Sequence, residues 1–396
     1  MCNTSSSISP VYILSSTRTA IGSYLGKLSN IPATTLGAQV IGDALKKANV
    51  DHKEVDEVIM GQVLQAGVGQ APARQAAIFA KLPSSTTCTT VNKVCGSGLK
   101  SIIMGAQAIK LNEANVVVAG GMENMSLSPH FIPNSRGGMK FGNVEIKDTM
   151  QWDGLWDVYS NRTMGSCAEE CVKRYSLSRS AQDEFAINSF KKAQQAIKDG
   201  VFANEISATT ILDKKGNIIV NEDEGPFKAN FEKIPALKAA FEKDGTITAA
   251  NASTINDGAA VLVLSGETSN AKAKAKFKIR SYASHAEDPT WFTIAPIGAI
   301  NKSLRLANLN LSDIGLFEIN EAFACVTMSA IRELKLDESK VNIFGGAVAL
   351  GHPIGASGAR IVVTLMNAME RKGVQFGLAA ICIGGGEALS MIIERI

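Results

Sequence analysis

The sequence of 396 residues lacks the features of several classes of protein. Its 40 basic and 37 acidic residues leave a net charge of +3, which gives no electrostatic field suited to nucleic acid. No apolar run is long enough to cross a bilayer, so we expect no membrane-spanning helix. The first residues, MCNTSSSISP, have neither the apolar core nor the basic flank of a signal peptide.

Cysteine occurs without a pattern. Seven cysteines form neither a CxxC pair nor a regular spacing, which argues against a disulfide framework and against a zinc site. Free thiols fit a reducing compartment, and we therefore expect a cytoplasmic protein. The cysteines stand at positions 2, 88, 95, 167, 171, 325 and 382.

Common nucleotide and hydrolase motifs are also missing. The sequence has no GxGxxG, and GSYLGKLS at 22–29 has neither the spacing nor the Ser or Thr of a P-loop. GxSxG and HExxH are absent as well. These absences argue against Rossmann cofactor chemistry, nucleotide hydrolysis and the usual serine and zinc hydrolases, and we expect no resident cofactor.

An internal repeat is present instead. The segment LKKANVDHKEVDEVIMGQV at 45–63 aligns without a gap with LRLANLNLSDIGLFEINEA at 304–322. SGLKSIIMGAQAI at 97–109 likewise matches SGARIVVTLMNAM at 357–369, and both are apolar or small on every side, as in a helix buried all round. The chain therefore contains two copies of one unit.

The first copy of the repeat is interrupted. VVVAGG at 116–121 resembles AAICIGGG at 379–386, but only the second is followed at once by a closing strand. The matching strand of the first copy is DGAAVLVLSGE at 257–267. We therefore predict an N-terminal unit (1–121 with 250–270), an insert (122–249) and a C-terminal unit (271–396). Alternating strands and helices predict an α/β fold with mixed or mainly parallel sheets, layered α-β-α-β-α around the two buried helices.

One cysteine occupies an unusual place. In VNKVCGSGLK, at 91–100, Cys95 stands where a strand-like run gives way to the first buried helix. Free N–H groups and the positive end of the helix dipole predict a lowered thiol pKa at this position, which suits a nucleophile. A small packing residue is the alternative.

Three further stretches lie at equivalent loops. Asn320, in NEAF, would adopt a left-handed turn or present an amide that orients a water. His352, in GGAVALGHPIGASGAR, would act as a base or as a hydrogen-bond donor, or would simply occupy a turn. Cys382 ends a buried strand before Gly-Gly-Gly, whose N–H groups could hold a developing negative charge.

Taken together, CGSGLK, NEAF, GHPIGASGAR and CIGGGEA resemble the thiolase family, and within it the short-chain acetoacetyl-CoA thiolases (acetyl-CoA C-acetyltransferases). The resemblance runs the full length, from STRTAIGSYLG at 16–26 through GGMENMS at 120–126 and NDGAA at 256–260. It implies reversible condensation of two acetyl-CoA to acetoacetyl-CoA and CoA, by a ping-pong cycle through an S-acetyl cysteine.

The resemblance also implies roles for single residues. Cys95 would be the nucleophile, and His352 would activate it. His352 and a water held by Asn320 would bind the oxygen of the second thioester. Cys382 would exchange the proton of the acetyl methyl group. The N–H groups of Cys95 and Gly384 would form a second oxyanion hole.

Substrate binding and assembly are implied in the same way. The resemblance predicts a homotetramer, a dimer of dimers, held through a loop at 124–145. Phe190 stands where the potassium-activated branch has a tyrosine, which predicts no metal. Thr163 departs from the family's usual histidine. The implied coenzyme A contacts are Leu155, Met164, Lys228, Phe241, Ala249, Ser253, Ala322 and Phe323.

Two alternatives stay open. One is a thiolase of β-oxidation that acts on longer 3-oxoacyl-CoA. The other is a non-catalytic member of the fold that binds acyl-CoA or lipid. The second cysteine, in ICIGGG, argues against a ketoacyl-carrier-protein synthase.

Overall fold

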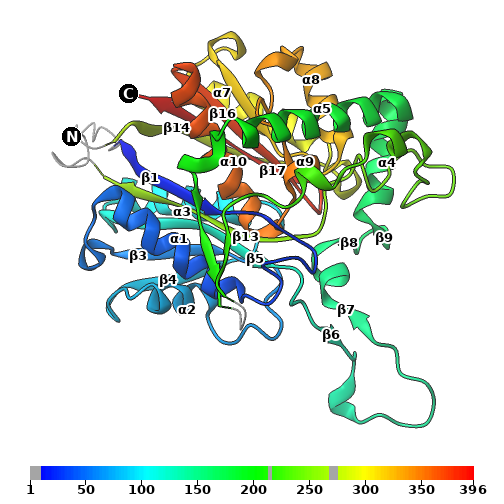
Figure 1. Ribbon diagram of the computed structural model, residues 1–396, viewed down its shortest axis with the longest axis horizontal. Coiled ribbons are helices and arrows are strands. Elements are labelled where there is room, and N and C mark those ends of the chain that lie inside the picture. The colour runs from blue at the N-terminus through cyan, green and yellow to red at the C-terminus, as the bar shows by residue number, and fades with distance from the viewer. Residues whose placement is uncertain (1–9, 213–215, 267–274) are drawn as a thin grey trace, which may run out of the picture.

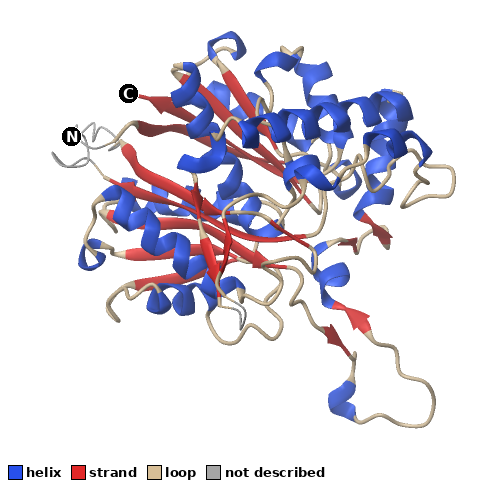
Figure 2. Ribbon diagram, in the orientation of Figure 1, coloured by secondary structure: helices blue, strands red, loops and turns tan. Residues whose placement is uncertain are grey.

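One mixed β-sheet runs through the molecule. The computed structural model describes residues 10–212, 216–266 and 275–396. Its sheet has eleven strands, and its main path is β15-β16-β17-β14-β1-β13-β5-β3-β4 (Figures 1 and 2). The strands of the N-terminal half are β1 (Val11–Thr19), β3 (Glu57–Gly61), β4 (Thr87–Val91), β5 (Val116–Asn124) and β13 (Asn256–Ser265). Those of the C-terminal half are β14 (Phe277–Ala286), β15 (Leu316–Ile319), β16 (Phe376–Ile383) and β17 (Glu387–Arg395).

Within the sheet, the two halves are joined by one strand pair. β1 and β14 are antiparallel, with Val11 opposite Ile279 and Ile13 opposite Phe277. The two sheets expected from the repeat are thus joined edge to edge into one. Pairing is parallel in β4-β3-β5 and in β15-β16, and antiparallel along the rest of this path. The expected mixed sheet is confirmed.

Helices form three layers around the sheet. α3 (Ser97–Lys110) and α10 (Ile354–Lys372) contact each other, and they are buried between the strands of the two halves. α1 (Ala33–Ala48) and α2 (Pro72–Phe79) cover the outer face of the N-terminal half. α7 (Ala295–Ala307) and α8 (Ala324–Leu334) cover the outer face of the C-terminal half. The predicted α-β-α-β-α layering is confirmed (Figure 1).

The two copies of the repeat end equivalent helices with the same kind of cap. Asn49 caps the C-terminus of α1 and Asn308 caps that of α7, and both asparagines are left-handed, with φ of 50° and 54°. A short 3₁₀ turn with a capping box follows each helix, at 52–54 and at 311–313, and each turn leads into a strand. Asparagine tolerates left-handed backbone, so it serves the same turn in both copies.

The insert between β5 and β13 supplies the cover over one end of the sheet. It contains α4 (Met164–Tyr175), α5 (Arg179–Lys198) and the short strands β6 (His130–Phe131), β7 (Lys147–Asp148), β8 (Trp156–Asp157), β9 (Arg162–Thr163), β10 (Ile206–Ser207), β11 (Thr209–Ile211) and β12 (Ile218–Val220). An arm between β6 and β7 projects from the body (Figure 1). The predicted boundary at 121/122 falls inside β5, and the one at 270/271 lies outside the described residues.

Among the described residues, no helix has the length and apolar character needed to cross a membrane. Two further short elements of the described residues are β2 (Gly22–Ser23), which pairs with β13, and α9 (Ala347–Leu350), which precedes the His352 loop.

Candidate active site

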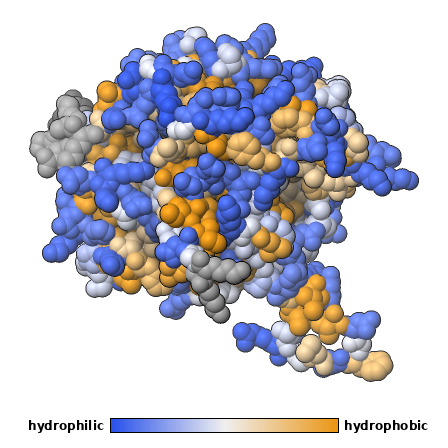
Figure 3. Space-filling model, viewed as in Figure 1, coloured by the Kyte–Doolittle hydropathy of each residue, from blue (hydrophilic) through white to orange (hydrophobic). Residues whose placement is uncertain are grey.

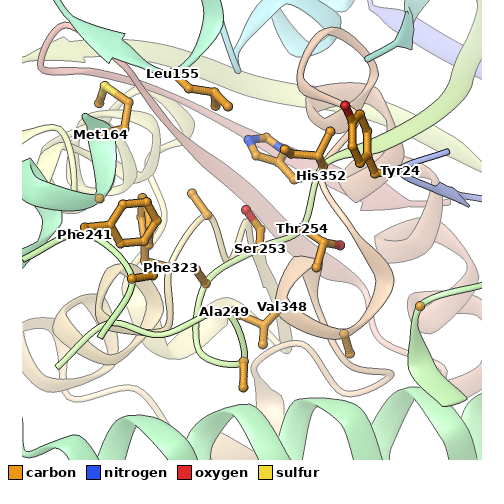
Figure 4. A pocket seen from close by; sticks show the side chains of 18 of the residues that line it. Tyr24, Leu155, Met164, Phe241, Ala249, Ser253, Thr254, Phe323, Val348 and His352 are labelled. Carbon is orange, nitrogen blue, oxygen red and sulfur yellow. The ribbon is translucent and has the colours of Figure 1, made fainter. Parts of the chain in front are cut away.

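Loops from both units and from the insert enclose one cavity of about 880 Å³. Cys95, His352 and Gly384 line it. All eight residues expected to contact coenzyme A line it too (Figure 4 labels several): Leu155, Met164, Lys228, Phe241, Ala249, Ser253, Ala322 and Phe323. Residues more than 250 positions apart in the sequence are thereby brought to one space.

Cys95 is held by a tight turn before α3. Gly96 caps the helix, and Val94 just before it has a positive φ of 45°. The side chain is partly buried and faces the cavity. Burial raises the pKa of the Cys95 thiol to about 11, and the charge of Glu123 adds to the rise. The lowered pKa predicted from the helix start is therefore wrong, because loss of water outweighs the favourable N–H groups. Cys95 needs a base to become a thiolate.

Two backbone N–H groups are directed at the sulfur of Cys95. They belong to Gly384 and to Cys95 itself, and both favour the negatively charged form of the thiol by lowering its pKa. Gly384 begins the turn between β16 and β17, in which Gly385 and Gly386 have φ of 91° and 86°. N–H groups that converge on one point in a dry site stabilise negative charge that develops there.

His352 is buried and oriented by neighbours. Its backbone N–H donates to Asn256 Oδ1 at 2.9 Å, and its ring Nδ1 lies 2.6 Å from Ser357 Oγ. The Ser357 hydroxyl donates to the Pro353 carbonyl at 2.9 Å, so its oxygen is left to accept from Nδ1–H. Nε2 then carries the lone pair and has no partner among the described residues.

The environment keeps the His352 ring neutral. Burial lowers the pKa of His352 to about 3, and the positive charge of Arg360 lowers it further. A neutral imidazole with a free Nε2 can accept a proton. The interpretation of His352 as a mere turn residue does not account for this arrangement.

Asn320 and Cys382 lie just behind the cavity wall. Neither belongs to the residues that line it, and both are buried. The amide of Asn320 has no partner at Nδ2 or Oδ1 among the described residues, which is rare for a buried amide. Asn320 does not have a positive φ, so the predicted left-handed turn is wrong.

The thiol of Cys382 is electrostatically linked to Cys95. Burial raises its pKa well above the usual value, and the charge of Cys95 raises it further, followed by that of Cys171. Cys382 sits at the end of β16 in a cluster with Phe323, Phe292 and Cys325. A thiol of this kind keeps its proton until a base within the site takes it.

Aromatic rings form the wall on the side of the insert. Phe323 makes edge-to-face contacts with Phe241 and Phe292, with ring centroids 5.9 Å and 6.2 Å away. Gly165 permits this packing, because a Cβ there would come within 2.2 Å of the Phe241 ring. The Ser253 N–H donates to the Ala322 carbonyl at 3.0 Å, which joins the segment just before β13 to the NEAF loop.

A buried carboxylate that the sequence reasoning missed holds the loops together. Glu123 accepts hydrogen bonds from the backbone N–H groups of Val63, Leu64 and Gly355 at 3.0, 3.2 and 2.9 Å. Burial raises its pKa to about 7. Gly121 lets β5 approach this point, because a Cβ there would lie 2.0 Å from the Gly355 carbonyl. Glu123 thus ties the end of β3 to the His352 loop.

Other residues of the cavity were also missed. Met125 and Ile354 lie inside the quoted motifs GGMENMS and GHPIGASGAR, so their position in the motif was the available signal. Ser357 follows His352 by about one helical turn in the same motif. Tyr24 lies in STRTAIGSYLG at 16–26, so its place in that quoted stretch was the available signal for it too.

Two departures from the family pattern also face the cavity. Thr163 caps α4, accepting a hydrogen bond from the Ser166 N–H at 3.3 Å, and lines the cavity. Phe190 lines it as well, with its ring 6.3 Å from that of Phe231. Among the described residues, no group of three or more His, Cys, Asp or Glu side chains is arranged to hold a metal ion.

The chain matches the models of one known protein family along nearly its whole length. Residues 11–268 match the model of the thiolase N-terminal domain, and residues 273–395 match that of the thiolase C-terminal domain. The mitochondrial acetyl-CoA acetyltransferase of Rattus norvegicus is 48% identical, over 98% of this chain and 92% of its own length. The acetyl-CoA acetyltransferase of Cupriavidus necator is also 48% identical, over 97% of this chain and 99% of its own.

Solved structures agree with the sequence matches. The crystal structure of the acetyl-CoA acetyltransferase of Bacillus anthracis superposes with a TM-score of 0.95 at 39% identity, covering 98% of this chain and 99% of that one. The Acat5 thiolase of Ascaris suum in complex with coenzyme A gives a TM-score of 0.92 at 45% identity, covering 98% of this chain and 100% of that one.

Proposed function

This chain belongs to the thiolase family, and we propose that it is an acetyl-CoA C-acetyltransferase that condenses two acetyl-CoA to acetoacetyl-CoA and CoA, reversibly. The observation that carries the proposal is the convergence of Cys95, His352 and the Gly384 N–H on one cavity, with the thiol of Cys382 close behind.

The first half-reaction is acetyl transfer to Cys95. Nε2 of His352 takes the thiol proton, and the thiolate attacks the thioester carbonyl of acetyl-CoA. The N–H groups of Cys95 and Gly384 stabilise the oxyanion of the tetrahedral intermediate. The intermediate collapses with release of the CoA thiolate, which receives the proton from His352. An S-acetyl enzyme remains.

The second half-reaction forms the carbon–carbon bond. The proton of Cys382 passes to Nε2 of His352, and the resulting Cys382 thiolate takes a proton from the methyl group of a second acetyl-CoA, whose thioester oxygen gains negative charge. His352 Nε2–H and a water held by Asn320 stabilise that charge. The carbanion attacks the acetyl group on Cys95, acetoacetyl-CoA leaves, and the Cys95 thiolate takes the proton from Nε2 of His352, which restores the thiols of Cys95 and Cys382 and the neutral ring. Two separate oxyanion sites are needed because the two charges develop on different oxygens.

Ser357 allows His352 to serve both halves. With the hydroxyl donating to Pro353, the ring has its proton on Nδ1 and Nε2 is a base. Once Nε2 has taken a proton, the Ser357 oxygen still accepts from Nδ1–H, and Nε2–H becomes a donor. The first state suits acetyl transfer, and the second suits the enolate.

Coenzyme A would occupy the cavity from the insert side. The apolar wall of Leu155, Met164, Phe241 and Phe323 suits a pantetheine chain, and Lys228 offers a positive charge for phosphate. We assign no resident metal or cofactor. Phe190 supports this assignment, because its ring offers no oxygen ligand for a potassium ion.

A homotetramer is part of the proposal. The arm between β6 and β7 exposes four apolar side chains that a monomer would leave in water: Met139, Phe141, Val144 and Ile146 (Figure 3). β4, at the edge of the sheet, pairs only with β3 among the described residues, which leaves a strand edge available to a second subunit.

The proposed compartment is the cytoplasm. Every cysteine among the described residues is free, which supports a reducing environment. The rat relative is described as mitochondrial, and the bacterial relative carries no such label. Fractionation of the source cells followed by an immunoblot tests the assignment, and recovery of the protein in an organelle fraction would overturn it.

The proposed activity is tested by steady-state assay. Purified protein should cleave acetoacetyl-CoA with CoA, and should release CoA from acetyl-CoA alone in the reverse direction. It should act on acetoacetyl-CoA faster than on 3-oxohexadecanoyl-CoA. A preference for the long substrate would support the β-oxidation alternative instead, and the absence of turnover with both would support a binding protein.

A further inference from the structure

An ion pair joins the two loops that supply the N–H groups around Cys95. Lys93 Nζ lies 2.5 Å from Glu387 Oε2. Lys93 is two residues before Cys95, and Glu387 is three residues after Gly384. The pair therefore links the N-terminal unit to the C-terminal unit at the edge of the site.

Neither member of the pair touches the substrate space. Lys93 and Glu387 do not line the cavity. Their side chains are 24% and 39% exposed, and partly exposed ion pairs add little to the stability of a fold. Neither fold stability nor substrate contact therefore explains the ion pair. Its place between the two loops is the feature that remains to be explained.

The Lys93 side of the pair is rigidly connected to Cys95. The Lys93 N–H donates to Ser97 Oγ at 2.8 Å, and the Gly96 N–H donates to the Lys93 carbonyl at 3.0 Å. Val94, between Lys93 and Cys95, has a positive φ of 45°, a strained conformation for a β-branched residue. Any displacement of Lys93 is therefore passed to the Cys95 N–H.

The Glu387 side lacks such internal support. Glu387 pairs with Ile383 across the turn of Gly384, Gly385 and Gly386, which has no side chains of its own. A hydrogen bond of 2.7 Å from the Glu287 N–H to the Gly386 carbonyl holds its far end. Glycine allows the positive φ angles of this turn but also leaves its backbone conformationally free. A contact from another loop is therefore needed to fix the position of the Gly384 N–H.

We propose that Lys93 and Glu387 are a positioning pair that holds the N–H groups of Cys95 and Gly384 at the spacing that acetyl transfer requires. The proposal rests on the proposed function for its role in catalysis. Its physical content is that the pair acts through the geometry of two loops. A displacement of about 1 Å in such a site can reduce a rate about 100-fold.

A direct charge effect on the thiol predicts a different pattern. Removing the positive charge of Lys93 would disfavour the Cys95 thiolate, whereas removing the negative charge of Glu387 would favour it. The two single variants would then change the reactivity of Cys95 in opposite directions. A positioning pair predicts that both variants reduce it.

The experiment is a double-mutant cycle with Lys93→Gln, Glu387→Gln and the double variant. Alkylation of Cys95 by iodoacetamide, followed by peptide mass spectrometry, measures thiol reactivity without any acyl-CoA. Acetylation of Cys95 in a single turnover of acetyl-CoA measures the catalytic step. Glu394→Gln is the matched control, because Glu394 at the other end of β17 forms a partly buried ion pair with Lys278 of β14 at 3.2 Å, away from the loops around Cys95.

Each single variant should slow both reactions about tenfold, and the double variant should be no slower than either single one. The control should stay within about twofold of the wild type, and melting temperatures should change little in all variants. Opposite effects of the two single variants, additive losses in the double variant or an equal loss in the control would overturn the proposal. If the wild type never acetylates Cys95, the proposed function fails, and the alkylation series still decides the role of the pair.

Discussion

Replacing Cys382 with serine should separate the two half-reactions. Cys382 lies behind the cavity wall, and its charge interacts with that of Cys95. A serine hydroxyl has a pKa far above that of a thiol, so it is a poor substitute for a group that must take and return a proton. Proton transfer by a positioned side chain contributes about 10²–10⁴-fold, and we expect condensation to fall about 10³-fold.

Acetyl transfer should survive the same change. It needs Cys95, His352 and the two N–H groups, none of which Cys382 touches by a hydrogen bond. We expect the rate of Cys95 acetylation to stay within about threefold of the wild type, because only one nearby titratable group is altered. Burying a hydroxyl in place of the thiol costs about 1–3 kcal/mol of folding free energy.

The assay has two arms. Rapid mixing with acetyl-CoA, acid quench and mass spectrometry follow acetyl-enzyme formation, and CoA release follows condensation. Cys171→Ser is the matched control, because Cys171 is buried in the same cluster but has no part in the proposed cycle. Near-normal condensation in Cys382→Ser, or loss of acetylation together with condensation, would refute the division of labour between the two thiols.

Four further predictions concern other parts of the site and the arm. Ser357→Ala should slow both half-reactions about tenfold, whereas Ser357→Thr should retain most activity, because only threonine keeps a hydroxyl for the ring of His352. An unchanged kcat in the alanine variant would contradict this role. As pH falls from 6.5 toward 3, the wild type should lose folding stability relative to His352→Asn, by about 2 kcal/mol at pH 5, measured by urea denaturation. The reason is that the unfolded chain takes up a proton on His352, whereas the buried ring, with its pKa lowered to about 3, does not. If the stability of the two proteins changed in parallel with pH, the ring would not be buried and neutral. Activity should be equal in potassium and sodium chloride, since Phe190 offers no ligand oxygen, and stimulation by potassium alone would show that a site exists. Phe141→Asp should convert tetramers to smaller species in analytical ultracentrifugation, because it places a charge in the apolar arm; an unchanged sedimentation coefficient would exclude the arm from assembly.

The fold could be predicted largely because the repeat carries its own local signals. Asn49 and Asn308 end equivalent helices, and the apolar segments at 97–109 and 357–369 become the two central helices. The joining of both halves through β1 and β14 could not be predicted, because it depends on edge pairing between strands distant in the sequence. Patterns among neighbouring residues do not indicate which strand edges will pair in the sheet.

The site was predictable where a residue sits in a compact motif. Cys95, His352 and Gly384 were found that way. The pKa of the Cys95 thiol was not predictable. The start of α3 suggested a lowered pKa, but burial of the thiol raises it instead. Glu123 was missed because its three N–H partners come from two separate loops.

The most direct test of the account is to locate the acetyl group during turnover. The protein is mixed with acetyl-CoA, quenched in acid within seconds and digested for peptide mass spectrometry. We predict an acetyl group on the peptide that contains Cys95 and none on the peptide that contains Cys382. Acetylation of Cys382, or active condensation with no acetyl group on Cys95, would contradict the account.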